Sequence, residues 1–380
     1  MQESFLYVLV YIPIIPLEYY LKIITVALLP DFVKQELFRD GPTAISPWRG
    51  ISQALNPRSE PNDPILFVMY EGDAIRAYLG CLPDWCWAGE EMIRCAWLTS
   101  LWVDPAVRGQ GLAKQLVKEA MEHWDHHILI TEYTPETGGM YHRMGLFDVW
   151  EGAAGFRGYI QPDFATLLAS KNRFFKRIKS VLGVLDSIVR PFTDVRLSYY
   201  YPSLPSIDYL HKVDSESEDF ICALSEGEAI RRGSDELNWA LTFPWVYEVP
   251  PAEGFASERY YFTSLSPTFK QYTCKIQDDA GDMIGFLLWT IREGHLKVRY
   301  CYALPEGYTA VAETINYHAF ALRAKMVTCL HEGVAKALGS ARKSPYFYTK
   351  TFRQPVMISK RLGPPDLFRF QSGDGDAVFT

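Results

Sequence analysis

The stretch Trp97–Lys118, WLTSLWVDPAVRGQGLAKQLVK, decides the fold of this chain. Residues 97–103 have the apolar character of a buried strand, which Asp104-Pro105 ends. A loop with two glycines, Arg108-Gly109-Gln110-Gly111, follows and opens an amphipathic helix expected over 111–124. Such a loop directs unpaired backbone N–H groups and the positive end of the helix dipole to one point. The stretch therefore predicts a phosphate or pyrophosphate site, where glycine lets the ligand approach the backbone.

Strands and helices alternate on both sides of this stretch. An apolar lead with a helix over 17–38 and a loop-rich connector over 41–63 are expected before it. The remaining pattern predicts strands at 65–70, 74–82, 93–103, 127–133 and 146–150, with helices at 111–124 and 135–144. This alternation predicts a mixed sheet flanked by helices.

A second unit follows with a similar order of elements. Its expected elements are strands at 271–277, 283–291 and 295–303, one long helix over 312–338, and strands at 346–352 and 356–362. The repeat lies in the order of elements and not in residue identity. After Ala303 comes Leu304-Pro305-Glu306-Gly307-Tyr308, without the loop of the first unit. The second unit is therefore not expected to hold a phosphate in the same way.

Arg108-x-x-Gly111-x-Ala113, placed after a strand and at the start of a helix, resembles the acyl-CoA pyrophosphate loop of the GNAT superfamily of N-acetyltransferases. The resemblance covers about residues 60–160. It implies an α/β fold of two GNAT-like units, each with a mixed, mostly antiparallel sheet flanked by helices, and with the acyl-CoA loop only in the first. The chain lacks GxGxxG and the Lys-Ser/Thr of a Walker loop, which speaks against dinucleotide-binding and P-loop folds.

The chain is accordingly divided into five segments. They are a helical and loop lead over 1–62, a GNAT domain with the acyl-CoA site over 63–163, a basic amphipathic inter-domain helix over 164–206, a second GNAT-like domain over 207–365, and a polar tail over 366–380. Within the tail, Gly373–Asp376 (GDGD) is expected to be disordered or a surface turn, because its spacing does not fit a calcium loop.

The resemblance also implies the donor-binding residues. The backbone of Leu101, Trp102 and Val103 would contact the pantetheine and the thioester, and the pyrophosphate would lie on Arg108, Gly109, Gln110, Gly111, Leu112 and Ala113. Tyr141 starts a segment similar to the family's Tyr-x-x-x-Gly, although Leu146 stands where the family usually has Phe. The resemblance makes Tyr141 the proton donor for the leaving thiolate, and the alternative is a core aromatic with its hydroxyl satisfied.

Removal of the amine proton needs a general base, for which Glu132 is the first candidate. It follows a buried strand at the point where that strand should diverge from the donor. Asp104, His142 and Glu91 are alternatives, and Glu132 itself can be read as a solvated surface group. Ser46, Arg49, Ser52 and Gln53 fit either a substrate cleft or a solvated loop. His126-His127 has no third ligand at a suitable spacing, so no metal site is expected.

Composition narrows the class of protein. The 380 residues are 48% hydrophobic and 22% charged, typical of a folded chain long enough for two domains. A net charge of −7 speaks against binding nucleic acid. Seven cysteines without CxxC pairs, and no secretory signal, indicate a reducing cytoplasm.

Two segments raise the question of membrane contact. Residues 5–38 are apolar but interrupted by Pro13, Pro16, Glu18 and Lys22, and residues 171–190 form a basic amphipathic pattern. Each fits peripheral membrane contact, and each also fits ordinary packing within the protein.

The expected activity is transfer of an acetyl group from acetyl-CoA to a primary amine of a small molecule or amino sugar, by direct transfer in a ternary complex. Two alternatives remain. One is a tandem-GNAT aminoacyl or acyl transferase acting on cell-envelope precursors. The other is a non-catalytic acyl-CoA-binding or membrane-associated protein.

Overall fold

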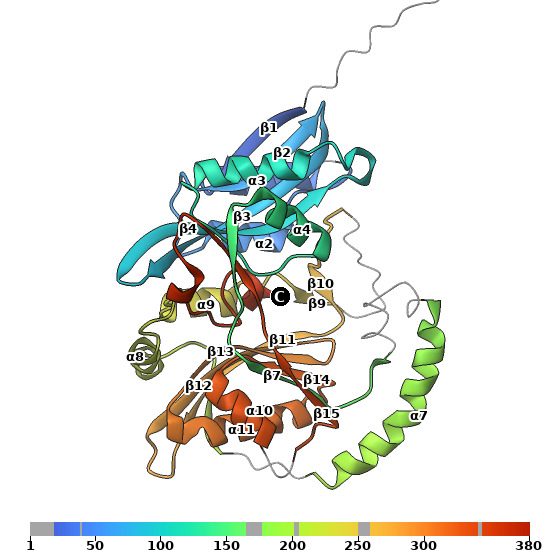
Figure 1. Ribbon diagram of the computed structural model, residues 1–380, viewed down its shortest axis with the longest axis vertical. Coiled ribbons are helices and arrows are strands. Elements are labelled where there is room, and N and C mark those ends of the chain that lie inside the picture. The colour runs from blue at the N-terminus through green and yellow to red at the C-terminus, as the bar shows by residue number, and fades with distance from the viewer. Residues whose placement is uncertain (1–18, 39, 165–176, 201–204, 250–258, 341–343) are drawn as a thin grey trace, which may run out of the picture.

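The computed structural model describes residues 19–38, 40–164, 177–200, 205–249, 259–340 and 344–380. Two seven-stranded mixed sheets lie one above the other, with helices outside and between them (Figure 1). This confirms the predicted fold class of two α/β units. No helix in the described ranges is both long and apolar enough to cross a membrane.

The first sheet has the strand order β1-β2-β3-β4-β5-β16-β6. Its strands are β1 Tyr19–Thr25, β2 Pro64–Glu71, β3 Ala74–Ala88, β4 Glu91–Val103, β5 Ile128–Ile130, β16 Val356–Ser359 and β6 Phe147–Trp150. The helices α3 Leu112–His123 and α4 Pro135–Met144 cover one face, where Leu116, Val117 and Ala120 of α3 are buried. The other face packs against α1 Leu29–Leu37, residues near Tyr260 and the second unit, while α2 Pro47–Ala54 follows α1 in the chain.

The second sheet has the order β15-β7-β14-β13-β12-β11-β8. Its strands are β15 Tyr348–Phe352, β7 Gly155–Tyr159, β14 Met326–Cys329, β13 His295–Ala303, β12 Met283–Arg292, β11 Phe269–Gln277 and β8 Ser206–Leu210. The helices α10 Tyr308–Ala321 and α11 Glu332–Ser340 pack on its outer face. The helices α8 Ser215–Leu224 and α9 Ser234–Thr242 lie on the inner side, with the short strands β9 Tyr247–Glu248 and β10 Leu265–Ser266 beside them.

The two sheets exchange one strand each. β16, near the end of the chain, pairs antiparallel with both β5 and β6 of the first sheet. β7, from the first part of the chain, pairs antiparallel with β14 and β15 of the second. The predicted domain boundaries at 163 and 207 assign one continuous stretch of chain to each unit. The sheets are not continuous in this way, because β7 belongs to the second sheet and β16 to the first.

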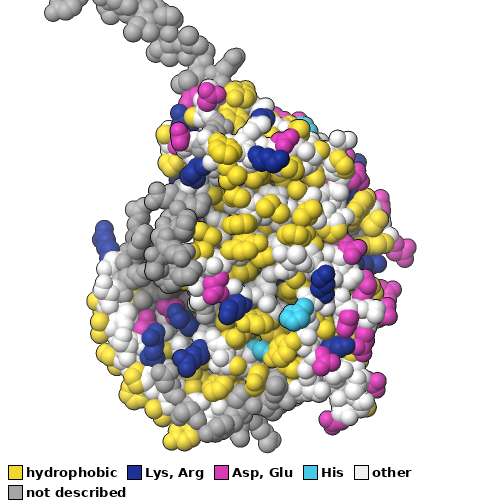
Figure 2. Space-filling model, turned by 180° about the vertical axis from the view of Figure 1, so that it is seen from behind, with side chains coloured by type: hydrophobic (Ala, Val, Ile, Leu, Met, Phe, Trp, Pro, Cys, Tyr) yellow, Lys and Arg dark blue, Asp and Glu magenta, His cyan; other side chains and the backbone are white. Residues whose placement is uncertain are grey.

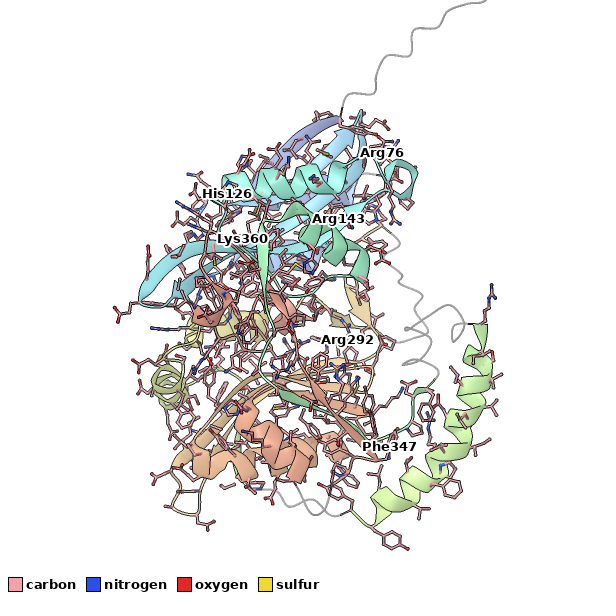
Figure 3. All side chains as sticks on the ribbon, viewed as in Figure 1. Arg76, His126, Arg143, Arg292, Phe347 and Lys360 are labelled. Carbon is pink, nitrogen blue, oxygen red and sulfur yellow. The ribbon has the colours of Figure 1, made fainter. Side chains whose placement is uncertain are left out.

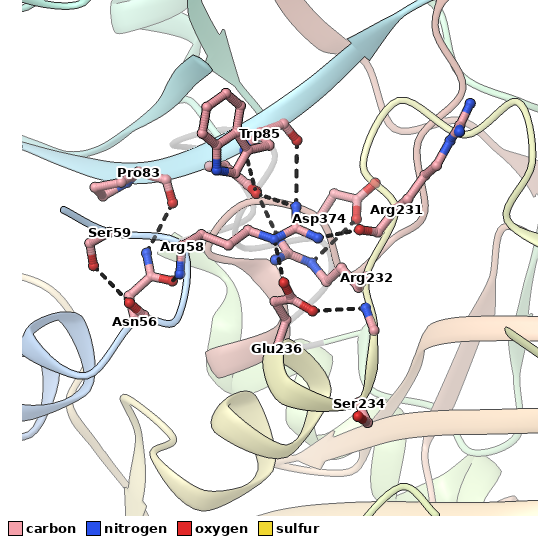
Figure 4. A network of polar contacts seen from close by, with 12 residues as sticks. Asn56, Arg58, Ser59, Pro83, Trp85, Arg231, Arg232, Ser234, Glu236 and Asp374 are labelled. Carbon is pink, nitrogen blue, oxygen red and sulfur yellow. Dashed lines mark hydrogen bonds and ion pairs between the residues drawn. The ribbon is translucent and has the colours of Figure 1, made fainter. Parts of the chain in front are cut away.

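One core joins the two units. Trp97 and Leu129 from the first sheet share it with Phe286, Leu288 and Tyr300 from the second. A buried polar network reinforces the junction (Figure 4). In this network Arg58 contacts Asp84 at 2.6 Å and Glu236 at 2.7 Å, and Arg232 contacts the other oxygen of Asp84 at 2.9 Å. Because each charge has an opposite partner, the network tolerates its burial.

The predicted helix over 17–38 is wrong in its first half. Residues 19–25 form β1, which pairs antiparallel with β2 along its whole length, and only Leu29–Leu37 are helical. The side chains of β1 alternate in burial, as expected for an edge strand with one covered face. Pairing with β2 decides the outcome, and such pairing is invisible in local sequence.

The predicted long helix over 312–338 is also wrong. It consists of α10, the strand β14 and α11. Arg323 has a positive φ of 51° just after α10, where the helix ends. Residues 326–329 then pair with β13 and β7. A short buried strand shows no alternation of apolar and polar residues, so its sequence cannot be distinguished from that of the apolar helices on either side.

The tail over 366–380 is neither disordered nor a surface turn. Phe368, Asp374 and Phe379 are each 1% exposed. The ring of Phe379 stacks on Trp245 at 4.6 Å and meets Trp239 at 4.7 Å. The end of the chain is thus enclosed between the two units, as Figure 1 shows.

The predicted basic helix is α7, Lys179–Ser198, which lies along one side of the molecule (Figure 1). Residues 171–176 of the predicted basic pattern lie outside the described residues, as do residues 1–18 of the apolar lead.

Candidate active site

The strand at the centre of the first unit separates from its parallel neighbour. β4 and β5 are paired only at Ala96–Ile128 and Trp97–Leu129. After that, β4 contains a bulge against β3, and Ser100 at the bulge has a φ of 51°. Beyond the bulge, the segment Leu101 to Val103 remains next to β3 on one edge. Within the described residues, no strand pairs with the opposite edge of this segment. That edge offers backbone N–H and C=O groups to a ligand.

The loop after β4 forms an open cradle at the start of α3. Gly109 and Gly111 have φ of 86° and 89°, and no atom lies within 4 Å of where a Cβ would be at either position. Gly111 is the N-cap of α3 and supplies no side-chain cap. The first backbone N–H groups of α3 have no carbonyl partner within the helix, as at any helix N-terminus. Unused donors, open space and the helix dipole together fit a pyrophosphate.

Side chains around the cradle hold its shape. Asp104 accepts a hydrogen bond from the backbone N–H of Ala106 at 2.9 Å and pairs with Arg76 at 2.7 Å. The Ala106 bond and the Arg76 pairing lower the pKa of Asp104. Arg108 donates from Nε to the Val103 carbonyl at 3.3 Å, and Gln110 accepts from the Tyr19 hydroxyl at 2.7 Å. Asp104 therefore anchors the loop as a carboxylate, which speaks against its alternative role as the base.

The corresponding turn of the second unit is filled. Gly307 is buried with an ordinary φ of −82°, and a Cβ there would lie 2.5 Å from the Ile284 carbonyl. The ring of Tyr308 packs directly over Gly333. The space that stays open beside Gly109 and Gly111 is thus closed in the second unit, as the sequence predicts.

Tyr141 lies on α4, inside the core of the first unit. It is 3% exposed and meets Tyr133 and Phe147 edge to face, with ring centres 6.4 and 5.7 Å away. Burial raises the pKa of its hydroxyl, so the group keeps its proton. A protonated phenol can donate a proton to a leaving thiolate.

A cavity of about 370 Å³ opens beside the bulge, between the two units. Its lining includes Ser46, Arg49, Thr99, Ser100, Glu132, Trp245, Tyr260 and Asp376. Arg49 organises one wall: its guanidinium donates to Thr99, to Ser100 and, at 3.0 Å, to the Tyr260 hydroxyl. It also lies 4.0 Å from the ring centre of Trp245.

Two carboxylates face this cavity. Glu132, which follows β5, is exposed into it, and Asp376 lies beside the neighbouring Thr131, whose Oγ1 donates to the carboxylate at 3.5 Å. Burial raises the pKa of Asp376 to about 6, with Arg49 lowering it and Glu132 raising it. A carboxylate that titrates near neutral pH suits proton removal from an amine.

The other sequence candidates lie elsewhere. His142 on α4 and Glu91 at the start of β4 are exposed and do not line the cavity. Ser52 and Gln53 are buried on α2, where the Ser52 carbonyl accepts the indole N–H of Trp239 at 2.8 Å. Of the four polar residues that fit a substrate cleft or a solvated loop in the sequence, Ser46 and Arg49 line the cavity, and Ser52 and Gln53 do not.

Sequence reasoning missed Asp376, Tyr260 and Arg292, all of which line the cavity. Each belongs to the second half of the chain and reaches the first half only through folding. One local signal was present for Asp376, because the apolar Ala-Val-Phe after GDGD is unusual for a solvated tail.

Comparisons with known proteins agree with this geometry. Residues 28–146 match the model of the acetyltransferase (GNAT) family. A search of curated proteins found no match.

Several solved structures are similar to this chain at low sequence identity. A GCN5-related N-acetyltransferase from Anabaena variabilis is 12% identical, with 90% of this chain and 72% of that chain covered and a TM-score of 0.45. N-myristoyltransferase from Saccharomyces cerevisiae with bound myristoyl-CoA is 10% identical, with 91% and 84% covered and a TM-score of 0.47. A tandem GNAT protein from the clavulanic acid pathway is 15% identical, with 91% and 99% covered and a TM-score of 0.44. Values this low transfer no substrate to this chain.

Proposed function

We propose that this protein is an acyl-CoA-dependent N-acyltransferase, a proposal supported by the match of residues 28–146 to the model of the acetyltransferase (GNAT) family. The observation that carries the proposal is the open cradle at Gly109 and Gly111, reached from the splayed edge of β4. Acetyl-CoA is the proposed donor, and a primary amine of a small molecule or amino sugar is the proposed acceptor. Transfer is direct, in a ternary complex.

The first unit supplies the donor contacts. The backbone N–H groups of Gly109 to Ala113 and the guanidinium of Arg108 hold the pyrophosphate, and the free edge of Leu101 to Val103 holds the pantetheine and polarises the thioester oxygen. The donor, when bound, brings an activated acyl group next to the cavity.

The carboxylates of Glu132 and Asp376 take the proton from the acceptor amine, directly or through a water molecule. The amine nitrogen then forms its bond to the acyl carbon as the carbon–sulfur bond breaks. Tyr141 donates its proton to the departing sulfur. The carboxylate then releases its proton to solvent and the Tyr141 phenolate takes one back from solvent, so that an amine and a thioester give an amide and a thiol with no other reactant.

Release of the free CoA thiol in the presence of an amine panel tests this proposal. The wild-type chain is expected to consume acetyl-CoA faster with at least one amine than without any. Asp376→Asn should slow that reaction while binding acetyl-CoA as the wild type does. An absence of acetyl-CoA binding by the wild type would refute the proposal.

A reducing compartment such as the cytoplasm fits this function, because all seven cysteines are free thiols. The helix α7 favours a location at a membrane surface within that compartment. Its exposed residues include an apolar stripe at helical spacing: Val181, Val184, Leu185, Ile188, Phe192, Val195 and Tyr199. The side turned inward carries Asp186 and Thr193, both buried. An outward apolar face of this kind suits the interface of a lipid bilayer.

Liposome flotation tests the membrane contact. The wild-type chain should float with anionic vesicles, and Ile188→Ser with Phe192→Ser should remain at the bottom of the gradient. Equal flotation of both proteins would contradict the assignment of α7.

A further inference from the structure

A second cavity, of about 210 Å³, lies on the inner side of the second sheet. It adjoins the cavity of about 370 Å³ that Glu132 and Asp376 face, which we call the acceptor cavity, because Arg292 and Thr380 line both. Figure 3 places Arg292 between the two sheets. Cationic side chains dominate its lining: Arg292, Lys297, Arg299 and Lys325. Burial and the neighbouring cations lower the pKa of His295, which also lines the cavity, so that its ring is neutral.

The alternation of β13 explains this concentration of charge. Leu296 and Val298 point into the outer core against α10 and α11, so His295 and Lys297 point to the opposite, inner face. A register shift between Leu288 and Trp289 of β12 then leaves Arg299 unpaired at a bulge. Farther along the strand the inner face becomes apolar, with Tyr300 and Tyr302 in the shared core. The cations thus gather at the end of the inner face that borders the acceptor cavity.

Three of these cations have no acidic side chain as a partner. Within the described ranges, no Asp or Glu carboxylate forms an ion pair with Arg292, Lys297 or Arg299, whereas Lys325 pairs with Asp163 at 3.4 Å. Arg299 is 1% exposed and donates to the Thr290 hydroxyl at 3.0 Å and to the Thr380 backbone oxygen. The side chains of Arg292 and Lys297 make no hydrogen bond to described residues.

The acids at the edge of the cavity do not pair with Arg292, Lys297 or Arg299. Asp163 pairs with Lys325 at 3.4 Å, and Glu293 is exposed and accepts from the Ser266 hydroxyl at 3.3 Å. Glu132, across the cavity, attracts Lys297 and Arg299 without pairing with them. Burial and the neighbouring Arg299 lower the pKa of Lys297 to about 8, which shows that its charge is unfavourable there. A cavity lined by cations without acidic partners, one of them with a perturbed pKa, is a candidate binding site for an anion.

Figure 2, from behind, shows the same asymmetry on a larger scale. Several Lys and Arg side chains group at the lower left, over the second unit, while Asp and Glu lie mainly along the right edge.

We propose that Arg292, Lys297 and Arg299 form a subsite for an anionic group of the acceptor, a carboxylate or a phosphate. The guanidinium groups supply paired donors that match either anion, and Lys297 supplies a point charge. The volume of the cavity suits one small anionic group. This inference rests on the proposed function, because the anion would fix the acceptor so that its amine reaches Glu132 and Asp376. The acceptor class is therefore narrowed to amines that carry a negative charge.

Binding of simple anions tests the subsite. The full chain is first saturated with CoA, so that the cradle at Gly111 is occupied, and then titrated with inorganic phosphate or with succinate while its unfolding temperature is followed. We expect at least one probe to raise the unfolding temperature, and the probe that does so distinguishes phosphate from carboxylate. Lys297→Gln should weaken the response at least tenfold.

Lys336→Gln is the matched control. It removes the same charge from α11, where Lys336 is exposed and paired with Glu332 at 2.8 Å. The control should respond to the anion as the wild type does. An unchanged response in Lys297→Gln, or no response of the wild type to either probe, would overturn the subsite.

A stability measurement separates a binding role from a structural one. Without added anion, Lys297→Met should unfold at a higher temperature than the wild type, because a half-buried charge without an acidic partner is replaced by an apolar chain of similar length. A lower unfolding temperature would mean that Lys297 holds the fold together, and would overturn the proposal.

Acetyl-CoA binding, measured on the same proteins, keeps the two proposals apart. Intact acetyl-CoA binding without an anion response overturns the subsite alone. An anion response without acetyl-CoA binding overturns the proposed function, and with it the acceptor role of the subsite.

Discussion

Replacement of Gly111 by alanine separates the cost of backbone strain from the loss of a ligand contact. Gly111 has a φ of 89°, and an added methyl group would meet no protein atom within 4 Å. The variant should therefore fold. Its stability should fall by about 1–2 kcal/mol, the cost of a left-handed conformation for an L-residue.

The methyl group would lie at the mouth of the cradle and keep the pyrophosphate from the first N–H groups of α3. Loss of one hydrogen bond to a charged group costs about 1.5–3 kcal/mol. That loss corresponds to a dissociation constant for acetyl-CoA raised about 10- to 150-fold. Titration calorimetry measures this change directly.

Gly281 provides the matched control. It lies in the hairpin between β11 and β12, with the same φ of 89° and the same open surroundings. Gly281→Ala should lose as much stability as Gly111→Ala and bind acetyl-CoA like the wild type. Two results would refute the proposal that the cradle binds acetyl-CoA. One is an equal dissociation constant for Gly111→Ala and wild type, and the other is an equally weakened binding in Gly111→Ala and Gly281→Ala.

Three other substitutions test the remaining parts. Tyr141→Phe should lower kcat about 10- to 100-fold and leave the KM for acetyl-CoA unchanged, because the phenol donates its proton only as the carbon–sulfur bond breaks. Steady-state kinetics measure both values, and an unchanged kcat would mean that Tyr141 is only a core aromatic. Asp376→Asn should remove the acidic limb, near pH 6, from the pH profile of kcat/KM, whereas a retained limb would assign that titration to another group. Burial raises the pKa of Asp374 to about 8, so the folded protein holds a proton that the unfolded chain releases above about pH 4. Stability should therefore fall as pH rises from about 4 to 8, by up to about 1.4 kcal/mol per pH unit from this group. Asp374→Asn should flatten that slope in urea unfolding between pH 5 and 8, and an unchanged slope would contradict the assignment.

The parts of the fold that sequence predicts are those fixed by local pattern. The segment from β4 through α3 carries its own strand, breaker, glycines and amphipathic helix, and the structure reproduces each of them. The sequence Leu304–Tyr308 lacks the Arg-x-x-Gly-x-Ala pattern, which predicts no cradle after β13. In the structure the glycine there has an ordinary φ and a packed neighbour.

The parts that sequence does not predict depend on partners far along the chain. β1 is a strand because β2 pairs with it, and β14 is a strand because β13 and β7 lie on either side. The exchange of β7 and β16 between the sheets leaves no local trace, because each strand has the same alternation whichever sheet receives it.

The same reasoning applies to the site. The cradle follows from residues adjacent in sequence, whereas the acceptor cavity joins Arg49, Glu132 and Asp376 across more than 300 positions. Asp376 belongs to a run of Gly and Asp that reads as a solvated turn. Only the burial of Phe379 between Trp239 and Trp245 places that carboxylate at the cavity.

The stoichiometry of acetyl-CoA binding to the wild-type chain tests most directly the claim that one unit holds the donor and the other does not. Titration calorimetry should give one acetyl-CoA per chain, and Gly111→Glu should abolish the heat of binding. Two molecules per chain would show that the turn at Leu304–Tyr308 also binds the donor. No binding, or one molecule per chain that persists in Gly111→Glu, would contradict the assignment of the cradle.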